Sequence, residues 1–111
     1  MSARERLPNR RGSVTFAFDC GPHRYVATIS FFPGADRLAE IFLGNGRAGS
    51  DIDAAAKDSA VVASIALQHG VSVDTIRKAL LRDNQGKANS PLGCALDAIA
   101  VAAGSRSEAT R

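Results

Sequence analysis

The segment from Glu40 to Val71 constrains the fold most strongly, because it joins a strand to a long helix through a glycine-rich corner. The corner runs from Gly44 to Gly49. Ser50 is a favourable helix N-cap after it, and Asp53, three residues later, completes an acidic version of the capping box. The helix is predicted over residues 51–69 and is apolar on nearly every side. Such a helix is expected at the centre of a fold, buried on several faces.

Three short segments before this helix have the composition and alternation of strands. The first alternates apolar and small or polar residues, and the second is rich in β-branched and aromatic residues. The predicted strands are 13–19, 24–32 and 37–43. Turn residues occupy the short stretches between them, which predicts an antiparallel meander.

Two more helices are predicted after Gly70, which suits the left-handed position that ends the first helix. One covers residues 73–82. The other covers residues 91–103, begins at a proline and ends at Gly104. Its expected inward stripe is Leu92, Ala95, Leu96, Ile99 and Ala103. Strands followed by helices predict an α+β fold, a three-stranded antiparallel meander followed by three helices packed on one face.

The length of 111 residues fits one domain, predicted over residues 13–104 between a basic flexible arm, 1–12, and a flexible tail, 105–111. The net charge of +3 lies entirely in the arm, because residues 13–111 carry ten basic and ten acidic side chains. The basic residues of the arm are Arg4, Arg6, Arg10 and Arg11. Such an arm can contact phosphates or an acidic protein surface, or it can simply be a solvated terminus.

No apolar run approaches the length of about 20 residues that a membrane helix needs. The first residues carry charge without the apolar stretch of a secretory signal. We therefore expect a cytoplasmic protein with no membrane partner.

The glycine corner has the spacing GxGxxG between a strand and a helix. In a dinucleotide-binding fold a parallel strand follows that helix, whereas here another helix follows, which excludes this fold. Two interpretations remain. One is an anion-binding site, formed by Gly46, Arg47, Gly49 and Ser50. The other is a corner that lets the helix pack closely on the sheet; it is favoured because acidic residues in the first helical turn would repel a phosphate.

The two cysteines, Cys20 and Cys94, are far apart in the sequence and form no CxxC motif. Together with His23 and His69 they have no recognisable zinc-ligand spacing, so no metal site is predicted. Two reduced, partly buried thiols are expected. No carboxylate pair or Ser/His/Asp arrangement is evident, so no catalytic residue is predicted.

Three further polar residues lie on predicted helices. Ser59 and Ser64 are expected to bond to carbonyls of their own helix. Asp97 is expected to face solvent or to pair with a basic residue across an interface.

Several short pieces of the chain, in order and spacing, resemble the TSCPD domain. They are Cys20-Gly21, Tyr25-Val26, Glu40–Phe42, Gly46–Ser50, Ser64–Leu67, Gly70-Val71, Ser90–Gly93 and Leu96–Ile99. This domain is found at the C-terminal end of adenosylcobalamin-dependent (class II) ribonucleotide reductases and as short free-standing proteins, which the first residues resemble. One departure concerns the name-giving signature: Cys94 stands three residues before Asp97, and Leu96 replaces the family's proline.

The resemblance implies a free-standing accessory or regulatory module that docks on a ribonucleotide reductase or on another protein and is not catalytic alone. No cofactor is expected on this chain, because the family's adenosylcobalamin belongs to the large catalytic domain. Two alternatives remain open. One is a component of ribonucleotide reduction (ribonucleoside-diphosphate reductase), with Cys20 and Cys94 as a thiol relay. The other is a nucleotide- or nucleic-acid-binding module that uses the arginine arm and the glycine corner. The apolar, alanine-rich helices also suggest a homodimer or a protein partner.

Overall fold

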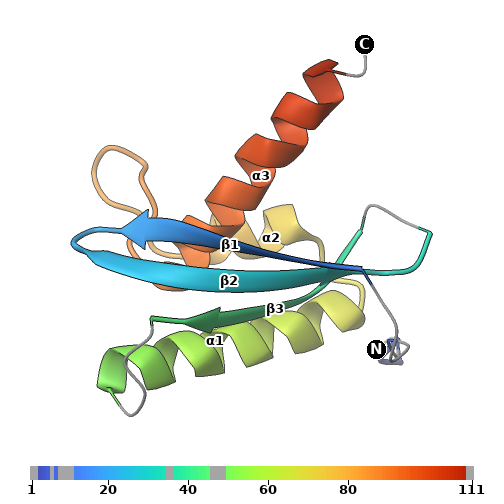
Figure 1. The fold of residues 1–111 in the computed structure, drawn as a ribbon, viewed down its shortest axis with the longest axis horizontal. Coiled ribbons are helices and arrows are strands. Elements are labelled where there is room, and N and C mark those ends of the chain that lie inside the picture. The colour runs from blue at the N-terminus through green and yellow to red at the C-terminus, as the bar shows by residue number, and fades with distance from the viewer. Residues whose placement is uncertain (1–2, 6, 8–11, 35–36, 46–49, 110–111) are drawn as a thin grey trace.

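The computed structural model describes residues 3–5, 7, 12–34, 37–45 and 50–109, with only the backbone described for 103–109. It confirms the predicted α+β fold (Figure 1). Three strands form one antiparallel sheet in the order β1-β2-β3. They are β1 (Ser13–Cys20), β2 (His23–Phe31) and β3 (Leu38–Gly44), each within one residue of its predicted bounds.

Three helices follow, namely α1 (Asp51–Gln68), α2 (Val73–Ala79) and α3 (Pro91–Ala109). The predicted caps of α1 are confirmed, because Ser50 accepts a hydrogen bond from the Asp53 amide and Gly70 has a φ of +93°. Helix α2 is shorter than predicted, since Leu80 is already extended at its C-cap and Arg82 forms a β-bridge with Ala88. Helix α3 does not end at Gly104 but continues to Ala109.

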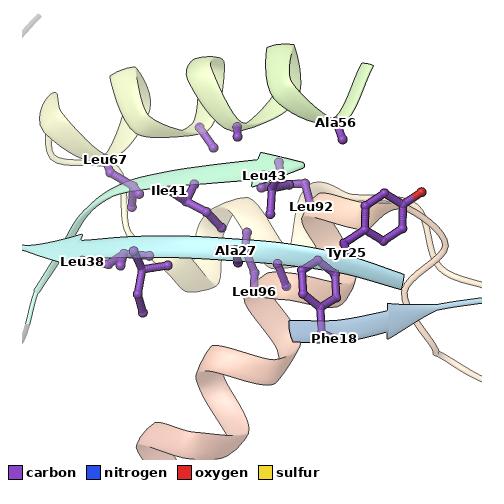
Figure 2. Close-up of a cluster of buried hydrophobic side chains, with 14 residues drawn as sticks. Phe18, Tyr25, Ala27, Leu38, Ile41, Leu43, Ala56, Leu67, Leu92 and Leu96 are labelled. Carbon is purple, nitrogen blue, oxygen red and sulfur yellow. The ribbon is translucent and has the colours of Figure 1, made fainter. Parts of the chain in front are cut away.

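All three strands turn one face toward the helices. The register places Phe16 opposite Ala27, Phe18 opposite Tyr25, and Ile29 opposite Ile41, and these side chains alternate with those on the other face. The Phe18 and Tyr25 rings stack at 5.6 Å between centroids. Buried side chains of α1 and α3 complete this core (Figure 2): Ala56, Ala60, Ala63, Leu67, Leu92, Ala95 and Leu96.

The expectation that α1 is buried on several faces is wrong. Its buried apolar side consists of alanines and Leu67, whereas Val61 and Val62 are 50% and 67% exposed, and Ile65 is exposed as well. The reason is the position of α1 beside the edge strand β3, where only small side chains fit between helix and strand. The larger side chains therefore point away from the sheet.

Two polar side chains of α1 complete the open edge of β3. The Ser64 hydroxyl donates to the Ile41 carbonyl at 3.0 Å and accepts from the Ile41 amide at 2.9 Å. The Gln68 amide donates to the Ala39 carbonyl at 3.1 Å. The expected bond of Ser64 to its own helix is therefore wrong, whereas Ser59 does donate to the Ala56 carbonyl. This pairing satisfies backbone groups that would otherwise form an unpaired sheet edge.

The segment between α2 and α3 is held by an ion-pair network around Asp97. The Arg82 guanidinium binds both carboxylate oxygens of Asp97, at 2.8 and 2.9 Å, and Arg77 Nε donates to the same carboxylate at 2.9 Å. These contacts hold the pKa of Asp97 down at about 2, mainly through Arg82. The two arginines thus connect α2 and the following loop to α3. Asp97 therefore does pair with basic residues, but within the chain and not across an interface.

Within the described residues, the helices are all too short or too polar to cross a membrane.

Candidate functional site

The fold brings Cys20 and Cys94 together. Cys20 ends β1 at the hairpin turn, and Cys94 lies in the first turn of α3, which begins after the N-cap Ser90. The Cys94 thiol also lies 3.6 Å from the Ala88 carbonyl, which it faces as a hydrogen-bond donor. Both thiols are free and partly buried, as the sequence predicts. Two cysteines separated by most of the chain therefore form a dithiol at the junction of sheet and helix.

The surroundings of Cys94 suppress the acidity of its thiol. Burial raises the pKa of the Cys94 thiol to about 12, and the hydrogen bond with Cys20 and the charge of Asp97 act in the same direction. Burial likewise raises the pKa of Tyr25, with smaller contributions from both cysteines. A thiol with so high a pKa is almost wholly protonated at neutral pH, and only the thiolate is a good nucleophile. Cys94 is thus unsuited to nucleophilic catalysis.

A cavity of about 360 Å³ lies against Cys20. The hairpin turn 21–23 and the loop 83–89 form its walls, with Asp83 and Lys87 as charged lining residues. The Asp83 carboxylate is already occupied, because it accepts from the backbone amides of Gln85 and Lys87, which lower its pKa. No group of three metal-ligating side chains occurs in the described part of the chain.

A second, larger cavity of about 560 Å³ lies between α1 and the segment that precedes α3. Its lining is mostly apolar and includes Ile52 and Ala55 of α1, Leu80 and Leu81 after α2, and Leu92 of α3. The cavity adjoins the cysteine pocket through shared lining residues, namely His23, Tyr25 and Pro91. This side of the molecule therefore presents an apolar groove that borders the exposed Ile52 of α1.

The predicted anion site falls largely on residues 46–49, so Gly46, Arg47 and Gly49 lie outside the described residues. The hydroxyl of Ser50 is used as the N-cap of α1. Beside it, the buried Asp53 carboxylate accepts from the Asn45 amide at 3.1 Å and pairs with Lys57 at 2.8 Å. Hydrogen bonds from Lys57 and Asn45 lower the pKa of Asp53. The corner thus contains a carboxylate of its own.

Of the predicted basic arm, Arg6, Arg10 and Arg11 lie outside the described residues. Arg4 donates from Nε to the Gln68 side chain at 2.6 Å, and the Glu5 amide donates to the Gln68 carbonyl. Glu5 also pairs with Arg37 at 2.6 Å. This part of the arm therefore contacts the C-terminal end of α1.

The sequence identified both cysteines but not their contact, because no local spacing connects Cys20 to Cys94. It also did not identify Arg77 and Arg82 as partners of Asp97. The sequence holds a weak signal for these ion pairs. Arg77 lies on the short predicted helix 73–82, and Arg82 is its last residue, next to the polar connection to the last helix.

Comparison with known proteins relates about two thirds of the chain to a short part of much longer enzymes. The chain is 33% identical over 73 residues to the vitamin B12-dependent ribonucleotide reductase of Rhodopirellula baltica, and 36% identical over 72 residues to that of Agrobacterium fabrum. These alignments cover 66% and 64% of the chain. The chain is similar to part of a vitamin B12-dependent ribonucleotide reductase. It spans only 7% and 6% of the length of these two relatives. No family model and no solved structure matches it.

Proposed function

We propose that this chain is an accessory module of ribonucleotide reduction that acts by protein–protein contact and has no catalysis of its own. The observation that carries the proposal is the exposed apolar face of α1, formed by Val61, Val62 and Ile65. The partial similarity to vitamin B12-dependent ribonucleotide reductases supports such a reductase as the binding partner. Its finer assignment as a TSCPD-type domain rests on the resemblance of the short sequence pieces described above.

The face of α1 is suited to contact because its exposed side chains are branched and apolar, and a separate, N-terminal part of the same helix lines the apolar groove of about 560 Å³. Ile52, itself exposed, lines that groove from α1. Exposed apolar side chains are typical of protein interfaces, where a few anchoring side chains contribute most of the binding energy.

The thiol chemistry supports the non-catalytic part of the proposal. The raised pKa of Cys94 keeps its sulfur protonated at neutral pH. Its neighbour Asp97 is committed to Arg77 and Arg82 and is not available as a general base.

The test is a binding titration of the intact chain with the purified vitamin B12-dependent reductase of the same organism, by calorimetry. Val61→Glu and Val62→Glu place a charge on the α1 face and are expected to weaken binding at least about tenfold, or 1.4 kcal/mol. Val26→Glu is the matched control, because Val26 is 46% exposed on the opposite face of the sheet. Equal loss of affinity in all three variants, or no binding by the intact chain, would contradict the proposal.

A second candidate function is supported by the contact between Cys20 and Cys94, which fits a dithiol component of ribonucleotide reduction. Replacing both residues by serine should then reduce turnover of the reductase supplied with this chain, while leaving its affinity unchanged. Unchanged turnover would remove this candidate and leave the contact function in place.

A further inference from the structure

The outer edge of β1 differs from the outer edge of β3. At β3, the side chains of Ser64 and Gln68 occupy the backbone groups that point away from the sheet. At β1, none of the described residues outside the sheet forms a backbone hydrogen bond with the strand. The strand is eight residues long and pairs with β2 without a bulge. Such a regular, uncovered edge is a template for another strand.

The register identifies the free groups. Because Ile41 turns its amide and carbonyl toward Ser64, its partner Ile29 must turn its own toward β1, where it pairs with Val14. Hydrogen-bonded pairs then alternate along the hairpin, so Val14, Phe16 and Phe18 bond to β2. The amides and carbonyls of Thr15 and Ala17 consequently point outward.

Over its first six residues, Ser13 to Phe18, the edge strand lacks the usual protections. From Ser13 to Phe18 there is no lysine, no proline and no charged side chain. In addition, Val14 shares the core face with Phe16 but is 51% exposed. The core face is therefore left incomplete at this edge.

Helix α3 extends over the place that an added strand would occupy. It packs on the core face at β1 through Leu92 and Leu96, and Figure 1 shows its last turns projecting past β1, away from the sheet. Burial falls along the helix, from complete at Leu96 to partial at Ile99, and Val101 is 70% exposed. A strand added at β1 would lie beneath this projecting, apolar part of α3.

We propose that the chain forms a two-fold homodimer in which β1 of each copy pairs with β1 of the other, antiparallel, giving a continuous six-stranded sheet. A second copy fits because a two-fold axis places the β1 strands of the two copies side by side and antiparallel. Residues Ser13 to Phe18 carry no charge, so no like charges meet across this pairing. Each projecting α3 covers the partner's strand. The alanines of α3, Ala98 and Ala102 among them, let the two helices cross at close distance.

This surface is separate from the α1 face, so the dimer and the reductase contact can fail independently. The first measurement is the molar mass of the intact chain by size exclusion with light scattering over a dilution series. We expect twice the chain mass of 11.6 kDa at high concentration, dissociating on dilution. A mass of one chain at every concentration overturns the proposal.

The variant that tests the surface is Ala17→Lys, which places a charge on the exposed side of the edge strand. It should raise the dimer dissociation constant at least about tenfold, because it places a charged lysine from each copy in the seam between the two edge strands. Val26→Lys is the matched control on the same face but on the central strand β2, and it should leave the dimer unchanged. Val101→Asp tests the projecting part of α3 independently and should also weaken the dimer.

Amide hydrogen exchange followed by NMR supplies the most specific readout. In the dimer the amides of Thr15 and Ala17 should exchange slowly, and dilution or the Ala17→Lys change should release them. Phe16 and Phe18 bond to β2, so their amides should stay protected in every state and show that the variant is folded. A dimer in which Thr15 and Ala17 exchange freely would overturn the β1 pairing.

Discussion

Replacing Asp97 by asparagine should destabilise the protein in a way that depends on pH. The folded pKa of about 2, against an ordinary value of 3.8, means that the native state favours the carboxylate over the acid. The difference of just under two pH units corresponds to about 2 kcal/mol of unfolding free energy, at 1.36 kcal/mol per unit. The side chain is 28% exposed, so solvent screens the pair only in part.

The sign of the pH dependence follows from the lowered pKa. The stabilisation is fully present above the unfolded pKa near 4 and is lost as the pH falls through about 2. Urea unfolding of the intact protein and of Asp97→Asn should therefore differ by about 2 kcal/mol at pH 7, with the gap closing between pH 4 and pH 2.

The matched control for this measurement is Asp74→Asn. Asp74 pairs with the same Arg77 at 3.2 Å, but its side chain is 70% exposed. An exposed pair contributes between about 0 and 1 kcal/mol, so this variant should change stability little at any pH. If the deficit of Asp97→Asn is the same at pH 7 and pH 2, the loss comes from altered packing and not from the charge, which would refute the reasoning.

Three further predictions concern the sheet edge, the approach to α3 and the dithiol. Ser64→Ala leaves the Ile41 amide and carbonyl without their buried partner, so unfolding free energy should fall by about 1–3 kcal/mol and the Ile41 amide should exchange faster. Gly93→Ala places a methyl group 3.0 Å from the Ala88 Cβ, and this overpacking should lower the melting temperature, equivalent to about 1–3 kcal/mol. Cys94 should react with iodoacetamide at pH 8 far more slowly in the folded protein than in urea, because its pKa is about 12 when folded.

Each of these has an internal control. Ser59→Ala removes a bond within α1 only and should cost less than Ser64→Ala. Gly12→Ala meets no atom within 4 Å and should be neutral. A Gly93→Ala protein as stable as the parent would contradict the overpacking, because the loop that carries Ala88 would then move to make room. Equal alkylation rates with and without urea would contradict the burial of Cys94.

The strands and helix starts could be predicted from the sequence because their signals are local. Alternation defined β1, and β-branched and aromatic composition defined β2, each to within one residue. The Ser50 cap and Gly70 defined both ends of α1. The end of α2 could not be predicted, because it depends on the bridge that Arg82 forms with Ala88. That contact is visible only once the loop has closed.

The burial of α1 and the cysteine contact could not be predicted, for the same physical reason. Composition shows that α1 is apolar but does not show which side of it approaches the sheet. The helix lies so close to β3 that its small side chains are the ones buried, although its larger side chains are more hydrophobic. Likewise, Cys20 meets Cys94 only because the end of β1 lies under the first turn of α3. Long-range packing decides both outcomes.

Methyl NMR can show whether the exposed face of α1, formed by Val61, Val62 and Ile65, contacts a ribonucleotide reductase. The labelled chain would be titrated with the unlabelled vitamin B12-dependent reductase of the same organism. The methyl signals of Val61, Val62 and Ile65 should shift or broaden, while those of Val26 should stay unchanged. No change at saturating reductase, or changes at Val26 without changes on α1, would contradict this contact.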